Sequence, residues 1–239
     1  MKQIFLILLL PGFFFCGKKE ESKISAKGTI KFAIGDVSIV AKGSKEVGKK
    51  GDSLQEGDSI VTGAKSAAIV EFENNTGTVE IQQNSEFKIN KFNENEQELV
   101  SKSGSFWLDA KKINKNTNFQ VIMPTSVAGI RGTKLYSFEN KEAGITGICH
   151  CQGAVDFKEN SSNYSGSHDT DYLVITKDGK TIVLTHDDFK KAGMTADESH
   201  QHSMLDESPL GKKVNPDSEN VKKVNELIAK KFAETSPRP

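Results

Sequence analysis

Two cysteines and three histidines are the residues of this chain best suited to chemistry. Cys149 and Cys151 flank His150, and His200 and His202 repeat the same spacing further along the chain. Residues two apart on a strand point to the same face, so we expect the two sulfur atoms to project together, with His150 on the opposite face. Two thiolates and two imidazoles would satisfy tetrahedral Zn²⁺, and thiolates also suit Cu⁺.

The same spacing allows a simpler interpretation. Cysteines of zinc fingers and ribbons are usually separated by about two to four residues, and a c-type haem needs the pattern C-x-x-C-H. In an exported protein, Cys149 and Cys151 could instead be oxidised, as a tight disulfide or between two chains, with the histidines in solvated loops. A Zn or Cu site and an oxidised pair therefore stay open as alternatives, and no other cofactor is expected.

Catalytic machinery is not evident in the sequence. The serines lack the G-x-S-x-G pattern of a nucleophile elbow, and we find no carboxylate within an apolar run that would raise its pKa. His186, Asp187 and Asp188 are adjacent and could belong to a hydrolase, but three neighbouring residues do not define a site. We expect a protein that is not an enzyme.

The charge balance bears on the class of partner. The chain has 239 residues, with 32 basic and 32 acidic side chains and a formal net charge of zero. No global positive field would therefore attract nucleic acid, so nucleic-acid binding is not expected.

The N-terminus has the layout of a secretory signal, with a basic start and a short apolar core in residues 1–16. Cys16 follows this core and resembles the acylated cysteine of bacterial lipoproteins, which carries chains such as palmitate and anchors the protein in a membrane. Phe14 and Phe15 replace the usual small residues before it, as in the loosened signals of spirochaete-type lipoproteins. An uncleaved anchor or cleavage elsewhere are the alternatives. Each predicts a location in the cell envelope, periplasmic or outer-membrane, with residues 17–27 as a tether.

Short apolar runs separated by turn residues follow at a spacing of about ten residues, which predicts an all-β sandwich, roll or barrel over residues 28–157. Gly35 and Asp36 are suited to a tight turn between two strands. Trp107 lies in an alternating run and is expected to anchor the core or its rim.

The segment 118–138 is the most informative part of this pattern. Phe119, Val121 and Met123 predict one face of a strand that Pro124 ends, because proline cannot donate to a ladder. The next residues, with two glycines around Ile130 and Arg131, are expected to form a turn-rich crossing. A guanidinium there could donate to several carbonyl groups and hold the crossing together, which is favoured over the alternative that Arg131 contacts a ligand as a cation.

Two motifs in this region resemble the signatures of FecR-type domains. The run PTSVAGIRGT, from Pro124, resembles the family's "TP…V.G.RGT" segment, and GDSIVTGAKSAAIVEF, from Gly57, resembles its "GD.I.TG..S.A.I.F" segment. The resemblance covers about residues 28–157. The motif residues are Gly57, Asp58, Thr62, Gly63, Pro124, Gly129, Arg131, Gly132 and Thr133.

The resemblance implies an envelope protein that binds or senses a partner. The best-known members lie in the periplasm and relay the state of an iron-siderophore receptor to a sigma factor. We expect this chain to lack their anti-sigma and membrane-spanning parts, so a partner-binding lipoprotein is the favoured interpretation. A Zn or Cu protein using Cys149, Cys151, His200 and His202 is the alternative.

The last third of the chain changes character. Asp178 and Gly179, between two β-branched runs, predict a hairpin within a polar extension over residues 158–215. An apolar stripe at helical spacing then predicts a C-terminal amphipathic helix over residues 216–235 that docks on the domain. Its residues are Val221, Val224, Ile228 and Phe232.

Overall fold

The protein is described here by a computed structural model. It describes residues 26–110, 113, 116–160, 162, 164–168, 172–194 and 201–235. Cys16, the expected signal at 1–16 and almost all of the tether lie outside the described residues, as does His200.

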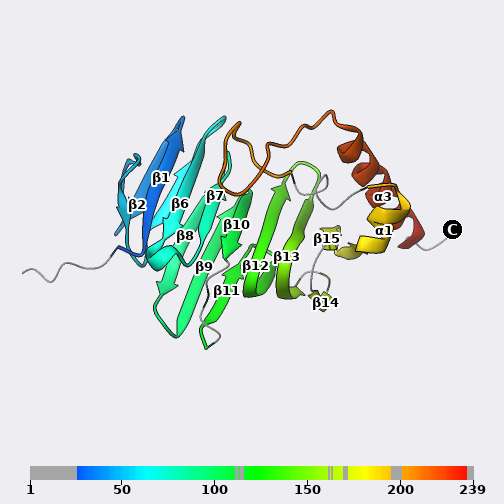
Figure 1. The fold of residues 1–239 in the computed structure, drawn as a ribbon, viewed down its shortest axis with the longest axis horizontal. Helices are drawn as coiled ribbons and strands as arrows, with labels where there is room; N and C mark the ends of the chain where they lie inside the picture. Colours follow the sequence, from blue (N-terminus) through cyan, green and yellow to red (C-terminus); the bar gives the residue numbers. More distant parts are fainter. Residues whose placement is uncertain are drawn as a thin grey trace, which may run out of the picture.

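The described residues form one curled sheet with two α-helices at its far end (Figure 1). The first strands are β1 (Gly28–Ile34), β2 (Val37–Ala41), β3 (Ser44–Val47), β4 (Ser53–Leu54), β5 (Ser59–Thr62), β6 (Ala67–Phe72), β7 (Thr78–Ile81) and β8 (Glu86–Phe92). They are followed by β9 (Glu96–Ser103), β10 (Phe106–Ala110), β11 (Asn118–Ile122), β12 (Ser126–Asn140), β13 (Ile145–Glu159), β14 (Tyr164–His168), β15 (Tyr172–Lys177) and β16 (Lys180–Leu184). The helical elements are η1 (Glu73–Asn75), α1 (His186–Lys191) and α3 (Glu219–Thr235). The all-β prediction is confirmed.

Strand β12 is where the sheet folds over on itself. Its first half pairs with β11, from Val127 to Gly129, and its second half pairs with β10, from Thr133 to Ser137. The strands β3-β2-β5-β8-β9-β11 therefore continue from one half of β12, and β10-β7-β6-β1-β4 continue from the other. The two groups face each other, so the curled sheet is a sandwich closed along one long strand.

Aromatic contacts join the two halves of this sandwich. The ring centroids of Phe87 on β8 and Phe106 on β10 are 5.1 Å apart, as are those of Phe72 on β6 and Phe92 on β8. Around them lies one cluster of buried apolar side chains, drawn from strands on both sides. Members that are at most 1% exposed include Ile30, Leu54, Ile60, Val70, Ile81, Ile89, Leu99, Leu108, Val121 and Leu135. We call the face that lines this cluster the inner face.

Two expected turns have a different role in the structure. The segment SVAGIRG is not a turn-rich crossing, because it lies within the 15 residues of β12. Gly35 and Asp36 do form a tight connection, but β1 and β2 do not pair with each other: β1 pairs with β4 and β6, and β2 with β3 and β5. This connection is therefore a corner between the two halves of the sandwich rather than a hairpin.

The sheet continues beyond residue 157. β13 pairs with β12 on one side and with β14 and β15 on the other, and β15 forms the predicted hairpin with β16. Asp178 and Gly179 have φ angles of 50° and 72°, as a type I′ turn requires.

Helix α3 covers this end of the sheet together with α1. Ser218 begins α3 by accepting a hydrogen bond from the backbone of Val221. Val224, Ile228 and Phe232 pack against a second apolar cluster, joined by Leu227. The predicted helix and its docking are therefore present. Within the residues that the structure describes, no helix is long and apolar enough to cross a membrane.

Candidate functional site

The outer face of the sheet carries a continuous row of paired residues across eight strands, which we call the outer row. Neighbours in this row are direct partners in adjacent strands, so their side chains lie on the same face. Phe32, at one end, is 37% exposed, whereas the members beyond it are buried or half-buried. The row runs Phe32, Ile69, Glu80, Trp107, Tyr136, Cys149, Leu173 and Leu184.

A long loop covers the middle of the outer row. Residues 201–214, which we call the cover loop, cross the ends of β7 and β10 in Figure 1, where they are drawn in orange. The backbone of Ser203 donates to the carbonyl of Lys212, and Val214 donates to the carbonyl of Ser203, so the loop is closed on itself.

The carboxylate of Glu80, on β7, binds the cover loop through hydrogen bonds. One of its side-chain oxygens accepts hydrogen bonds from the hydroxyls of Ser203 and Ser208, at 2.8 and 2.7 Å. The other accepts from the backbone N–H of Met204 at 2.9 Å. Glu80 and Ser203 are both completely buried. A buried carboxyl group with several donors is well satisfied, and removing it would leave those donors without partners.

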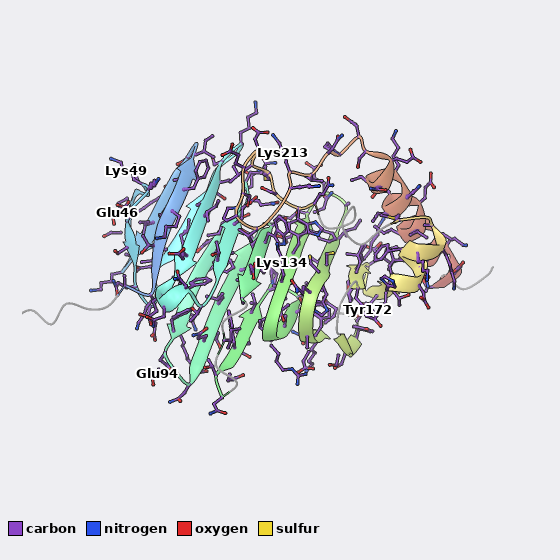
Figure 2. All side chains as sticks on the ribbon, viewed as in Figure 1. Glu46, Lys49, Glu94, Lys134, Tyr172 and Lys213 are labelled. Atoms are coloured by element: carbon purple, nitrogen blue, oxygen red, sulfur yellow. The ribbon has the colours of Figure 1, made fainter. Side chains whose placement is uncertain are left out.

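Trp107 provides a second attachment for the cover loop. Gly211 lies so close that an added Cβ would be 2.6 Å from the indole ring. Lys134 places its ammonium group 4.7 Å from the centre of the same ring and donates to the carbonyl of Leu210. Figure 2 shows Lys134 on β12 beneath the loop, with Lys213 on the loop itself. Trp107 is 1% exposed, so its prediction as an anchor is confirmed.

His202, at the start of the cover loop, is positioned by three contacts. Its backbone carbonyl accepts a hydrogen bond from the amide of Gln82. Its imidazole stacks on the Tyr136 ring, with centroids 4.4 Å apart and planes at 9°, and meets Trp107 edge-on at 5.4 Å. Burial raises the pKa of Tyr136 to about 12, and its hydroxyl donates to Gln82. The imidazole is therefore held against a neutral, rigid surface.

The same placement brings His202 to the two cysteines. Cys149 is the direct partner of Tyr136 in the outer row, and Cys151 follows two residues later in β13, where the register with β12 shifts. Ligand atoms of Cys149, Cys151 and His202 all lie within 4.8 Å of one another. His150 lies opposite Leu135 and is 2% exposed. The prediction that the sulfurs project together, with His150 on the other face, agrees with this arrangement.

Two buried thiols and an imidazole can do one of two things chemically. They can bind a metal ion that prefers sulfur, or the thiols can be oxidised. No disulfide joins Cys149 and Cys151. Their surroundings are apolar and include Leu173, Leu184 and Met194.

The first motif, from Gly57, serves the backbone of the sandwich. Gly57 has a φ of 95° and donates to Ile89, and the carboxylate of Asp58 accepts from the backbone of Gln55 at 2.8 Å. Thr62 donates to the carbonyl of Gln82. Gly63 donates to the carbonyl of Asp36, and an added Cβ there would meet the Asp36 side chain at 3.1 Å. These contacts join β5 and the turn before it to their neighbours in the sandwich.

The second motif forms a bulge in β12. Gly132 has a φ of 64°, and the register with β13 shifts between Arg131 and Lys134. On β13, an added Cβ at Gly153 would lie 2.2 Å from the Gly132 carbonyl oxygen. The buried hydroxyl of Thr133 donates to the carbonyl of Ala154 at 2.7 Å. A bulge bends its strand, and this one lies where β12 changes its partner from β11 to β10.

The other members of this motif have simpler roles. Pro124 lies in the turn after β11, which ends at Ile122, as predicted. Gly129 pairs with Asp156 within the ladder. The expectation that Arg131 binds carbonyl groups is wrong: its side chain is 62% exposed and forms two 2.6 Å hydrogen bonds to the carboxylate of Asp156. An exposed pair of this kind contributes little to stability.

His186, Asp187 and Asp188, which could have belonged to a hydrolase site, form the first turn of helix α1. Asp188 and Thr185 form a capping box, and Asp188 also pairs with Lys231 of α3 at 3.3 Å. Burial raises the pKa of Asp188, but the hydrogen bonds from Thr185 and the ion pair with Lys231 outweigh it, so that the pKa lies below its usual value. Asp188 is therefore used to start a helix and dock another.

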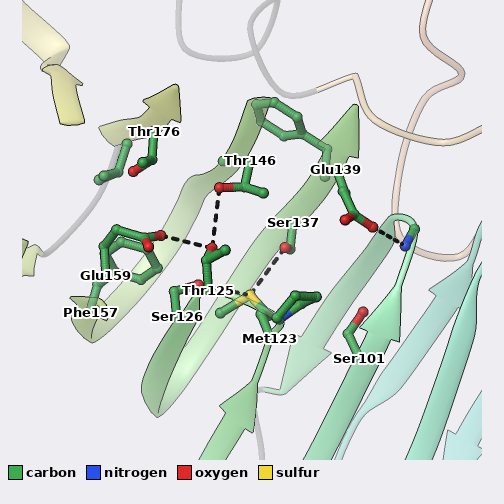
Figure 3. Close-up of a pocket in the computed structure, with 15 residues that line it drawn as sticks. Ser101, Met123, Thr125, Ser126, Ser137, Glu139, Thr146, Phe157, Glu159 and Thr176 are labelled. Carbon is green, nitrogen blue, oxygen red and sulfur yellow. Dashed lines mark hydrogen bonds between the residues drawn. The ribbon is translucent and has the colours of Figure 1, made fainter. Parts of the chain in front are cut away.

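A pocket between β11, β12 and β13 is too small for a ligand. Its volume is about 10 Å³, which is room for about one water molecule. Figure 3 shows Thr125 between Thr146 and Glu159. The Thr125 hydroxyl donates to Glu159 at 3.0 Å, and Glu159 is 1% exposed. The pocket is a packing defect that buried polar groups line.

Glu80 is the functional residue that sequence reasoning missed. It was passed over although it lies between Val79 and Ile81 in a buried strand. A lone acidic residue in such a run is the one signal that could have found it. The serines that it binds lie more than a hundred residues away in the chain.

The comparison with protein families agrees with the motifs. The model of the FecR protein family matches residues 58–156. Two crystal structures of a candidate anti-sigma factor from Parabacteroides distasonis, at 2.50 and 1.65 Å resolution, are similar to this chain with 12% identity and a TM-score of 0.48. They cover 56% of this chain, which spans 62% and 63% of theirs, less than two thirds of their length. No curated protein matches the chain.

Proposed function

Because this chain contains a FecR domain over residues 58–156, we propose that it is a non-enzymatic lipoprotein of the cell envelope that binds or senses a protein partner. The proposed anchor is an acyl group on Cys16, which follows an apolar run with a basic start. One acyl chain binds a membrane only weakly, so stable anchoring would need more than one.

The observation that carries the proposal is the uncovered end of the outer row. Phe32 and Ile34 on β1 are 37% and 50% exposed, whereas the other members of the outer row are buried or half-buried. They line a groove of about 520 Å³ beside the cover loop, together with Ala67, Met204 and Leu205, and the charged residues Lys65, Asp206, Glu207 and Lys213 complete its lining. Exposed apolar side chains that gather in one place favour a protein partner over a small polar ligand.

The motif residues support a binding function in a different way. Gly57, Asp58, Thr62 and Thr133 direct their polar groups to the backbone of the sandwich. They fix the shape of the scaffold, so recognition is left to the surface of the sheet and its loops.

Affinity capture of the full, acylated chain from envelope extracts tests this function. We expect the wild type and a Val47→Glu control to capture the same envelope protein, because Val47 is exposed on edge strand β3 and does not line the groove. The pair Phe32→Glu and Ile34→Glu should lose it. A Cys16→Ser variant should leave the membrane fraction.

Two results would contradict the proposal. One is a captured set of proteins that is the same for the wild type and the Phe32→Glu, Ile34→Glu variant. The other is membrane attachment that survives Cys16→Ser. The first would remove the groove as the binding surface, and the second would remove the acyl anchor.

A further inference from the structure

The outer row and the cover loop build a cluster that the FecR domain does not require. We propose that Cys149, Cys151 and His202 form a binding site for a thiophilic metal ion, Zn²⁺ or Cu⁺. This inference does not rest on the proposed partner-binding function.

The first support is that the three ligand atoms converge from distant parts of the chain. They lie within 4.8 Å of one another. In a tetrahedral zinc site, bonds of about 2.3 Å to sulfur and about 2.0 Å to nitrogen place the ligand atoms roughly 3.5–3.8 Å apart. The ligand atoms would therefore have to approach one another by at most about 1.0–1.3 Å to reach tetrahedral zinc distances, and rotation about the side-chain torsions can provide this shift.

The second support is that the histidine is held in place by contacts other than a metal. Tyr136 stacks on the imidazole, and Trp107 contacts it edge-on. Gln82 binds its backbone carbonyl, and Glu80 fixes Ser203 and Met204, which follow it. Metal sites work best when surrounding residues orient their ligands in advance.

The third support is the match between ligand type and surroundings. Cys149 and Cys151 are 6% and 8% exposed and lie in an apolar cluster. Buried charge is costly unless it is compensated. Two thiolates and a neutral imidazole around Zn²⁺ form a complex with no net charge, so zinc suits this pocket well. Cu⁺ would leave one negative charge but accepts three ligands of this soft type.

The number of protein ligands, three, determines the coordination of the bound metal ion. Zinc with three protein ligands keeps a fourth position for water or another small ligand. Binding displaces the proton of each thiol, so each metal ion should release about two protons to the solvent at neutral pH.

The test uses the full chain, reduced and purified without metal. We expect it to bind one Zn²⁺ per chain, with proton release, and to bind Co²⁺ with a thiolate-to-metal charge-transfer band. Cu⁺ is the second arm, and Mg²⁺, which prefers oxygen ligands, should not bind.

Matched variants assign the ligands. Cys149→Ser and Cys151→Ser should each weaken binding by more than about 100-fold, since loss of an outer-shell partner alone costs about 10–100-fold. His202→Phe keeps an aromatic ring against Tyr136 but removes the ligand nitrogen, and should weaken binding by more than about tenfold. His186→Ala, at an exposed histidine in the first turn of α1, should bind as the wild type does.

The apo proteins' circular dichroism and unfolding curves check that each variant folds. Glu80→Gln gives an independent measurement, because it loosens the cover loop without touching a ligand. It should weaken binding in the wild type but have no further effect in His202→Phe.

Three results would overturn the proposal. The reduced wild type could bind neither Zn²⁺ nor Cu⁺ at about one per chain. Binding could persist unchanged in the cysteine variants. His202→Phe could bind as tightly as the wild type, which would remove the histidine from the site.

Discussion

The inner and outer faces of the curled sheet are buried by different partners. The inner face packs against the opposite half of the same sandwich, through apolar contacts such as Phe87 against Phe106. The outer face is covered by the C-terminal part of the chain, with Glu80 and Trp107 holding the cover loop.

This difference separates what holds the fold from what builds a site. Burial of apolar area stabilises the whole domain, whereas a few hydrogen bonds to one loop stabilise that loop. The inner face should therefore open only on global unfolding, and the cover loop should open locally. Chemistry-bearing residues gather on the face with the weaker cover.

The largest effect is expected on the inner face. Phe106→Ala removes a ring that is 1% exposed and contacts Phe87, so it should lower the free energy of unfolding by about 3–5 kcal/mol. Phe32→Ala, at the uncovered end of the outer face, should cost less than about 1 kcal/mol. Denaturant unfolding measures both, and equal losses would mean that the two faces do not differ in this way.

An intermediate effect is expected for the attachment of the cover loop. Glu80→Gln leaves at least one of the donors from Ser203, Met204 and Ser208 without an acceptor, which should cost about 1–3 kcal/mol. Hydrogen exchange should locate the loss, with faster exchange at the Met204 and Leu205 amides.

The control for this change is Glu71→Gln on the neighbouring strand. Glu71 pairs with Lys31 at 2.8 Å, and both side chains are more than a third exposed. Glu71→Gln should change the free energy of unfolding by no more than about 0.5 kcal/mol. It should leave hydrogen exchange in the cover loop unchanged. If Glu80→Gln also speeds hydrogen exchange at the backbone amides of the sandwich strands, the cover loop and the sandwich unfold together.

The smallest effect is expected at Arg131, although it lies within the most informative motif. Arg131→Ala removes an exposed pair with Asp156 and should cost about 0.2–1 kcal/mol, less at high salt. A double-mutant cycle with Asp156→Ala isolates the pair. A coupling well above this range would mean that the motif arginine, and not the bulge at Gly132, stabilises β12.

Much of the fold could be predicted because it depends on local patterns. Alternation in Phe119, Val121 and Met123 gave a strand, Pro124 marked its end, and Asp178 with Gly179 marked a hairpin. The shared face of the two cysteines was predicted from the period of a strand, and the sulfurs do lie together although the register of β13 with β12 shifts at Cys151.

Other features of the fold could not be predicted from the sequence, because they depend on contacts between distant parts of the chain. Gly132 in β12 suggested a turn, but its positive φ serves a bulge opposite Gly153. Gly35 and Asp36 predicted a tight turn, which is present, but the two strands that they join pair with other strands and not with each other. A short sequence signal specifies a change of direction and does not specify which strands become neighbours.

The sequence alone determined the strand pattern, the two motifs, the C-terminal helix and the shared face of Cys149 and Cys151, because backbone geometry repeats over a few residues. Only the tertiary structure decided that His202 stacks on Tyr136 and lies within reach of both sulfurs. The reason is that the register across the four strands β7, β10, β12 and β13, together with a loop held by Glu80, brings these residues together, and no local pattern encodes that distance.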